Sequence, residues 1–206
     1  MSQQVRNNYI LIDYENVQPT SLVGLDQPHF KISVFIGAHQ TKISIDVAAA
    51  LQRMGPRAEY IKIAGNGTNA LDFHIAFYIG QLAAAEPDAY FHIISKDTGF
   101  APLIQHLRQK QILACRSHDI RTISVVKVAQ ATSLSAKVAV IVTNLHQRGA
   151  SKPRTLKTLS SSINALFHQA LSETEVSTLI HELHTQGMLT INNTKIAYTL
   201  PISADS

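Results

Sequence analysis

The sequence predicts an α/β protein: a parallel sheet between two layers of helices, followed by a second, smaller domain. Two observations support this prediction. Short apolar segments alternate with helical segments up to about residue 127, and the pattern then changes to helices followed by a hairpin. Alternating strands and helices form parallel sheets with right-handed crossovers. The expected fold class is therefore a three-layer α/β/α parallel sheet with a small domain attached.

The predicted strands are short runs rich in β-branched and aromatic residues, as buried strands usually are. They cover residues 9–13, 32–36, 58–63, 89–95 and 112–115. Three helical segments separate them: residues 41–53, closed by Gly55-Pro56, residues 70–85, closed by Glu86-Pro87, and residues 99–110. Ligands of such sheets bind beyond the carboxyl ends of the strands, so a site is expected there.

The second part of the chain has the order of a winged helix. Residues 133–149 predict a connecting helix, and two further helices and a hairpin follow. Ser172 and Glu175 have the spacing of a capping box, and Asn192-Asn193 between two alternating runs predicts the hairpin turn. The predicted organisation is a first domain over residues 1–127, a connecting helix and linker over 128–152, and a winged-helix-like domain over 153–206.

Composition restricts the class of protein. The 206 residues are 45% hydrophobic and 16% charged, which is typical of a globular chain and not of a disordered one. The apolar runs are too short to cross a membrane, and the first nine residues do not resemble a secretory signal. The single cysteine, Cys115, fits a reducing compartment, so a cytoplasmic protein is expected. The net charge of +4 favours an anionic partner.

Three aspartates stand where strands end or a helix begins. Asp13, with Glu15 and Asn16 close behind, ends the first strand; Asp72 lies in the first turn of the second helix, and Asp97 follows the fourth strand. In a parallel sheet these positions converge on one edge. Clustered carboxylates repel each other unless a hard cation neutralises them, and carboxylate and amide oxygens suit Mg²⁺ or Mn²⁺. The pattern predicts a metal site. Taken singly, an aspartate in such a place is usually a helix cap or turn former.

Three segments together resemble the PIN-like nucleases of the NYN type, over about residues 7–127. These segments are LIDYENVQP (11–19), GNGTNALDFHIAFYIGQL (65–82) and FHIISKDTGFAPLIQHL (91–107). The resemblance implies a metal-dependent endoribonuclease that hydrolyses single-stranded or structured RNA. It implies that Mg²⁺ or Mn²⁺ is bound by three aspartates, with a glutamate as a further candidate ligand and two polar residues supporting the site: Asp13, Asp72, Asp97, Glu15, Asn16 and Ser95. A homodimer is a further expectation from the resemblance.

The sequence also departs from this family pattern. Gly99 and Ala101 stand where relatives carry acids, and Thr68 stands where some carry a lysine. These departures motivate an alternative hypothesis, a catalytically weakened or inactive PIN-like protein that binds RNA and regulates. A DNA-directed nuclease is a third hypothesis.

Basic residues suggest where an anionic partner would bind. Lys152, Arg154 and Lys157 cluster at the start of the first helix of the small domain, and Lys96 and Arg108 are candidate phosphate contacts in the first domain. A winged helix serves equally as a protein-interaction or dimerisation unit, so RNA and a protein partner both stay open for the small domain.

Overall fold

The computed structural model describes residues 6–65, 67–167 and 171–201. Asn66 of the GNGTN loop, and the ends of the predicted domains at 1–5 and 202–206, lie outside the described residues. The chain divides into two compact units, Met1–Val126 and Lys127–Ser206.

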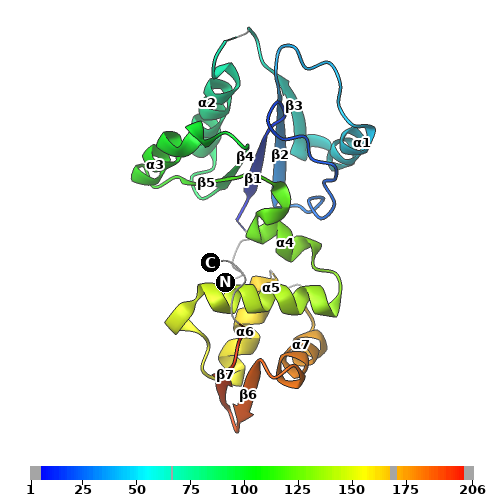
Figure 1. Ribbon diagram of the computed structural model, residues 1–206, viewed down its shortest axis with the longest axis vertical. Helices are drawn as coiled ribbons and strands as arrows, with labels where there is room; N and C mark the ends of the chain where they lie inside the picture. The colour runs from blue at the N-terminus through cyan, green and yellow to red at the C-terminus, as the bar shows by residue number, and fades with distance from the viewer. Residues whose placement is uncertain (1–5, 66, 168–170, 202–206) are drawn as a thin grey trace. The chain divides into compact units, whose positions relative to one another are not determined.

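The first unit is built on a five-stranded sheet in the order β3-β2-β1-β4-β5, and every neighbouring pair is parallel (Figure 1). The strands are β1 (Asn8–Asp13), β2 (Phe30–Ile36), β3 (Ala58–Lys62), β4 (Tyr90–Ile94) and β5 (Leu113–Ser117). The predicted α/β fold class is thus confirmed. The central strand β1 pairs with β4 so that Ile12 lies opposite Ile94, which brings the carboxyl ends of these two strands together.

Helices cover both faces of the sheet (Figure 1). On one face, α2 (Ala70–Ala85) and α3 (Ala101–Gln109) share an apolar cluster with β1 and β4. On the other lies α1 (Ile45–Met54), which buries Val47 and Leu51. The short α4 (Ser124–Gln130) runs across the boundary between the two units, and 3₁₀ turns occupy Gly55–Arg57, Thr98–Phe100 and Ile120–Thr122.

One predicted helix start was wrong. Helix α1 begins at Ile45 and not at Thr41, because Ser44 is extended and its backbone N–H donates to the buried hydroxyl of Tyr14. That contact crosses 30 positions of the chain, so local periodicity carries no sign of it.

The second unit contains α5 (Leu134–Gln147), α6 (Leu156–Leu166), α7 (Glu173–Thr185) and a hairpin of β6 (Leu189–Asn192) and β7 (Lys195–Tyr198), with a 3₁₀ turn at Gly149–Ser151. Its core joins all three helices to β6. The segment predicted as a connecting helix contributes Val138, Ile141 and Leu145 to this core, so it is a structural part of the unit.

The local signals in the second unit are partly confirmed. Ser172 and Glu175 form the predicted capping box. The hairpin turn, however, lies at Asn193-Thr194 and not at Asn192-Asn193, because Asn192 is still paired with Lys195. Asn193 takes a φ of 57°, a left-handed conformation that asparagine tolerates better than most residues.

None of the helices in the described residues combines the length and the apolar character that a membrane crossing requires.

Glu86 binds residues of two strands at the amino edge of the sheet, the edge at which the parallel strands begin. It follows α2, accepts hydrogen bonds from Asn7 Nδ2 (2.7 Å) and the Tyr9 hydroxyl (2.8 Å), and forms an ion pair with Lys31. Burial alone would raise the pKa of Glu86, but the hydrogen bonds from Lys31, Asn7 and Tyr9 outweigh it and lower this pKa to about 2. The carboxylate therefore joins the end of α2 to β1 and β2.

We expect Glu86→Gln to lower the melting temperature at pH 7 by about 3 °C, because a solvent-screened network of this kind contributes about 1 kcal/mol to the free energy of unfolding. Because the folded pKa is depressed, the contribution of Glu86 is complete above its ordinary value of 4.5 and is lost as the pH falls towards 2. Thermal unfolding of both proteins between pH 7 and pH 3 checks this, with Glu173→Gln as a control. An equal difference at every pH would contradict the assignment.

Candidate functional site

Asp13 is the most buried acid of the candidate site. It is the last residue of β1 and is 1% exposed. Its Oδ1 accepts from the Asn16 backbone N–H (3.2 Å), and its Oδ2 accepts from Asn16 Nδ2 and from Ser95 Oγ, both at 2.7 Å. The two oxygens of this buried carboxylate thus accept three hydrogen bonds from within the protein.

Ser95 links Asp13 to Asp97. Its hydroxyl is fully buried, donates to Asp13 and accepts from the Asp97 backbone N–H at 3.0 Å. The Asp97 carboxylate in turn accepts from the Gly99 N–H at 2.7 Å and caps the 3₁₀ turn that leads into α3. One hydrogen-bonded chain therefore joins four of the sequence-predicted residues: Asn16, Asp13, Ser95 and Asp97.

Asp72 joins this group through its charge. It lies in the first turn of α2, and its pKa is raised to about 6, first by burial and then by the charges of Asp97, Asp13 and Glu15. Repulsion of this kind raises a carboxyl pKa when other carboxylates lie nearby. Four acids from three separate stretches of the sequence thus share one electrostatic environment.

Glu15 rests over a glycine that sequence analysis did not single out. A Cβ atom on Gly37, directly after β2, would lie 1.5 Å from Glu15 Oε1. Only glycine leaves room for the carboxylate in this position. The sequence could have pointed to Gly37 as a site residue because it follows a strand at the same edge of the sheet. Its role, however, depends on the contact with Glu15, which the sequence does not show.

The basic candidates are distributed over both edges. Lys96 is exposed next to Asp97, and Arg116 of β5, which was not predicted, donates from Nη1 to the Ser95 carbonyl at 2.9 Å. Arg108 lies in the last turn of α3 and near Tyr90, the first residue of β4. It therefore belongs to the amino edge and lies away from the acids.

The chemistry of these residues fits a hard divalent cation. Carboxylate, hydroxyl and amide oxygens gather at one edge, and no ion pair found among the described residues neutralises Asp13, Glu15, Asp72 or Asp97. Within the same part of the chain, no three His, Cys, Asp or Glu side chains approach closely enough to form a metal-binding group. The acids therefore supply the charge for a cation but do not form a coordination sphere by themselves.

Gly99 has a steric consequence for Asp97. A Cβ at position 99 would lie 3.1 Å from Asp97 Oδ1, which is tighter than an ordinary contact. An acid at position 99 would crowd the Asp97 carboxylate as it is now placed. The observed position of this carboxylate in the turn therefore favours glycine at position 99.

A known protein family matches part of the chain. The model of the family described as PIN domain matches residues 7–117, which include the entire five-stranded sheet and every candidate acid. No curated protein and no solved structure matches the chain.

We expect Asp97→Asn to lower the pKa of Asp72 from about 6, because Asp97 contributes the largest of the three neighbouring charges. A carbon-detected NMR titration of the aspartate carboxyls in metal-free protein measures this pKa directly. Asp88→Asn, at the opposite end of α2, serves as the matched control. An Asp72 pKa that is the same in both variants would show that the charge of Asp97 does not contribute to it.

Proposed function

This chain belongs to the PIN domain family, whose members are generally metal-dependent nucleases, and from that premise we propose that it is an endoribonuclease of the NYN type. The observation that carries the proposal is the chain of hydrogen bonds through Ser95, which joins Asp13 to Asp97 at the carboxyl edge of the sheet. The proposed substrate is the phosphodiester backbone of RNA.

The acids have distinct roles in this proposal. Asp13, Asp72 and Asp97 hold Mg²⁺ or Mn²⁺, and Glu15, positioned over Gly37, is a further ligand. A divalent cation supplies Lewis acidity for phosphodiester hydrolysis. Asn16 and Ser95 fix the carboxylate of Asp13 by donating to it, and Ser95 also accepts from the backbone of Asp97. The exposed ammonium of Lys96 is suited to bind a phosphate of the RNA backbone.

A second candidate function is an RNA-binding regulator with weak or absent turnover. Two observations favour it. Gly99 and Ala101 stand where relatives carry acids, and the described residues contain no ready metal-binding group of three side chains. The two candidates differ in whether a bound cation turns the site into a catalyst, so a cleavage assay separates them.

For the second unit we propose a winged-helix-like fold that binds RNA, with a protein partner or a second copy of the chain as the alternative. Three exposed basic side chains lie on adjacent backbone segments: Arg154, Lys157 and Lys195. Thr155 forms an antiparallel bridge with Lys195, and the Ile196 N–H donates to the Arg154 carbonyl at 3.0 Å, so the hairpin adds Lys195 to the predicted basic cluster. Such a cluster is suited to phosphate contacts.

We expect the protein to cleave fluorescent single-stranded or hairpin RNA in Mn²⁺ or Mg²⁺ and to be inactive in EDTA. Asp97→Asn should reduce the rate by more than about 100-fold, since loss of a mere supporting partner of a ligand already costs about 10- to 100-fold. Ser95→Ala should fall within that smaller range. Gel analysis of the products, with single-stranded DNA alongside, measures the activity and the preference for RNA.

Asp88→Asn, purified in the same way, controls for changes in charge and handling. Cleavage that persists in Asp97→Asn would indicate a contaminating nuclease. RNA binding without cleavage by the wild-type protein would favour the regulatory candidate.

We expect replacement of Arg154, Lys157 and Lys195 by glutamine to weaken RNA binding without changing the maximal cleavage rate. The slope of log affinity against log salt concentration should shrink by about 2, because each lysine or arginine bound to a phosphate of a single strand adds about 0.7 to this slope. Fluorescence anisotropy at several salt concentrations measures the slope. An unchanged slope would favour the protein-partner alternative for this unit.

A further inference from the structure

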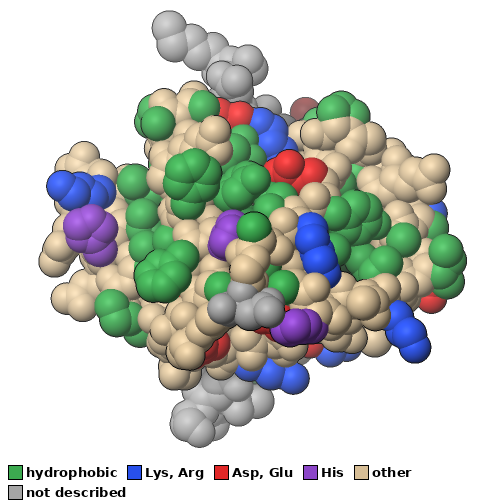
Figure 2. Space-filling model, turned by 90° about the horizontal axis from the view of Figure 1, so that it is seen from above, with side chains coloured by type: hydrophobic (Ala, Val, Ile, Leu, Met, Phe, Trp, Pro, Cys, Tyr) green, Lys and Arg blue, Asp and Glu red, His purple; other side chains and the backbone are tan. Residues whose placement is uncertain are grey.

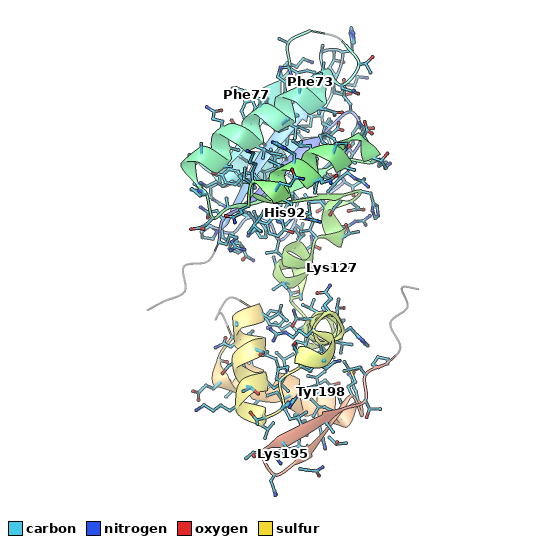
Figure 3. All side chains as sticks on the ribbon, turned by 90° about the vertical axis from the view of Figure 1, so that its left-hand side faces the viewer. Phe73, Phe77, His92, Lys127, Lys195 and Tyr198 are labelled. Atoms are coloured by element: carbon cyan, nitrogen blue, oxygen red, sulfur yellow. The ribbon has the colours of Figure 1, made fainter. Side chains whose placement is uncertain are left out.

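Two aromatic side chains are exposed on α2, beside the candidate site. Phe73 is 70% exposed and Phe77 is 66% exposed, and both lie on the helix that begins with Asp72 in its first turn (Figure 3). Between Ala70 and Ala85 the only Asp, Glu, Lys or Arg is Asp72. Single exposed apolar residues are common on protein surfaces, but an aromatic pair four residues apart forms a continuous surface.

The helical period places this pair opposite the core. Leu71, Ile75 and Ile79 are buried against the sheet, so Phe73 and Phe77, half a turn away, face outward. Seen from above, apolar side chains lie on both sides of this face of the molecule, with acidic and basic side chains between them (Figure 2). Phe73 directly follows Asp72 in the first turn of α2, so the aromatic pair begins at the end of the helix that carries this carboxylate.

We propose that Phe73 and Phe77 form a stacking platform for unpaired bases of the RNA on one side of the site. This inference rests on the proposed ribonuclease function and adds that the substrate is engaged as a single strand. A base stacked on an aromatic ring needs no particular sequence, because every base has a flat π-face. The platform thus selects unpaired RNA without sequence specificity.

The size of the surface favours bases over a second protein copy. An aromatic side chain buries at most about 150–250 Å², whereas a stable protein interface needs about 800 Å² from each partner. The neighbouring exposed positions on the same face of α2 are Gly80, Gln81 and Ala84, which add little apolar area. Two rings are too few for a dimer interface and sufficient for two nucleobases.

The rings are partly held in place by the fold. Phe77 packs edge-on against Tyr78, with ring centroids 5.7 Å apart, and Tyr78 packs edge-on against the buried Phe35 at 5.3 Å. Side chains four residues apart on a helix lie about 5–6 Å from each other. A Cβ built on Gly80 would meet nothing within 4 Å, so the surface beyond the rings is open.

The test combines protein variants with altered RNA. We would measure the affinity of the full chain for fluorescein-labelled single-stranded RNA by anisotropy in EDTA, and KM and kcat in Mn²⁺. The variants are Phe73→Ala/Phe77→Ala, Phe73→Tyr/Phe77→Tyr, which keeps both rings, and Ile45→Ala as a control at a residue that is 79% exposed on α1. The second RNA has the same backbone but carries abasic sites at consecutive positions.

We expect the double alanine variant to bind single-stranded RNA more weakly by about tenfold for each ring removed, and KM to rise with little change in kcat. The tyrosine variant and Ile45→Ala should bind as the wild type does. Abasic RNA should bind weakly to the wild type, and the alanine variant should bind it no more weakly, because both changes remove the same stacking interaction.

The inference alone would be overturned by wild-type cleavage of RNA with an unchanged KM in the alanine variant, or by an alanine variant that still distinguishes normal from abasic RNA. A change in sedimentation from dimer to monomer in that variant, with unchanged RNA affinity, would assign the pair to a second copy and also overturn it. A wild-type protein that neither binds nor cleaves RNA would overturn the proposed function itself.

Discussion

The arrangement of the candidate site depends on the hydrogen bond from Ser95 Oγ to Asp13 Oδ2. It is 2.7 Å long, fully buried, and joins residues 82 positions apart at the ends of β1 and β4. The parallel register, with Ile12 opposite Ile94, sets this contact, and a slip of either strand by one residue would turn its side chain to the other face. Without the hydroxyl a buried carboxylate would lose a donor, which is costly where water cannot replace it. The fold and the site are therefore specified by the same strand pairing.

The two acids at the ends of α2 show how charge is used differently at the two edges of the sheet. Glu86 has partners in Lys31, Asn7 and Tyr9, and its pKa is lowered to about 2. The pKa of Asp72 is raised to about 6 by burial and by three other carboxylates. A carboxylate satisfied within the protein stabilises the fold, whereas carboxylates that repel one another reduce stability unless something else neutralises them. The unneutralised charge thus separates a candidate site from a structural acid more clearly than the residue type does.

Much of the fold followed from local patterns, and most of the differences come from long-range contacts. Periodicity and the Glu86-Pro87 ending gave α2 its observed bounds. The start of α1 was wrong because the Tyr14 hydroxyl binds the backbone at Ser44, and the hairpin turn was displaced by the Asn192–Lys195 pair. Gly37 and Arg116 escaped notice because each acts through a residue distant in sequence. Asp13, Asp72 and Asp97 were found because each follows a local rule; their catalytic roles, with those of Asn16 and Ser95, stay a prediction.

Helix α2 brings several of these constraints into one rigid element. Its inward face carries Ile75 and Ile79 into the core, its first turn carries Asp72 to the acids, and Glu86 fastens its far end to β1 and β2. Because its inward face is buried and its far end is fastened, the outward Phe73 and Phe77 hold a defined position relative to Asp72. A strand stacked on these rings would present its backbone to the acids at a constant offset, which aligns a phosphate without any sequence-specific contact. The rings would not stack on the bases of a duplex, because those bases are already stacked on each other and leave no face free.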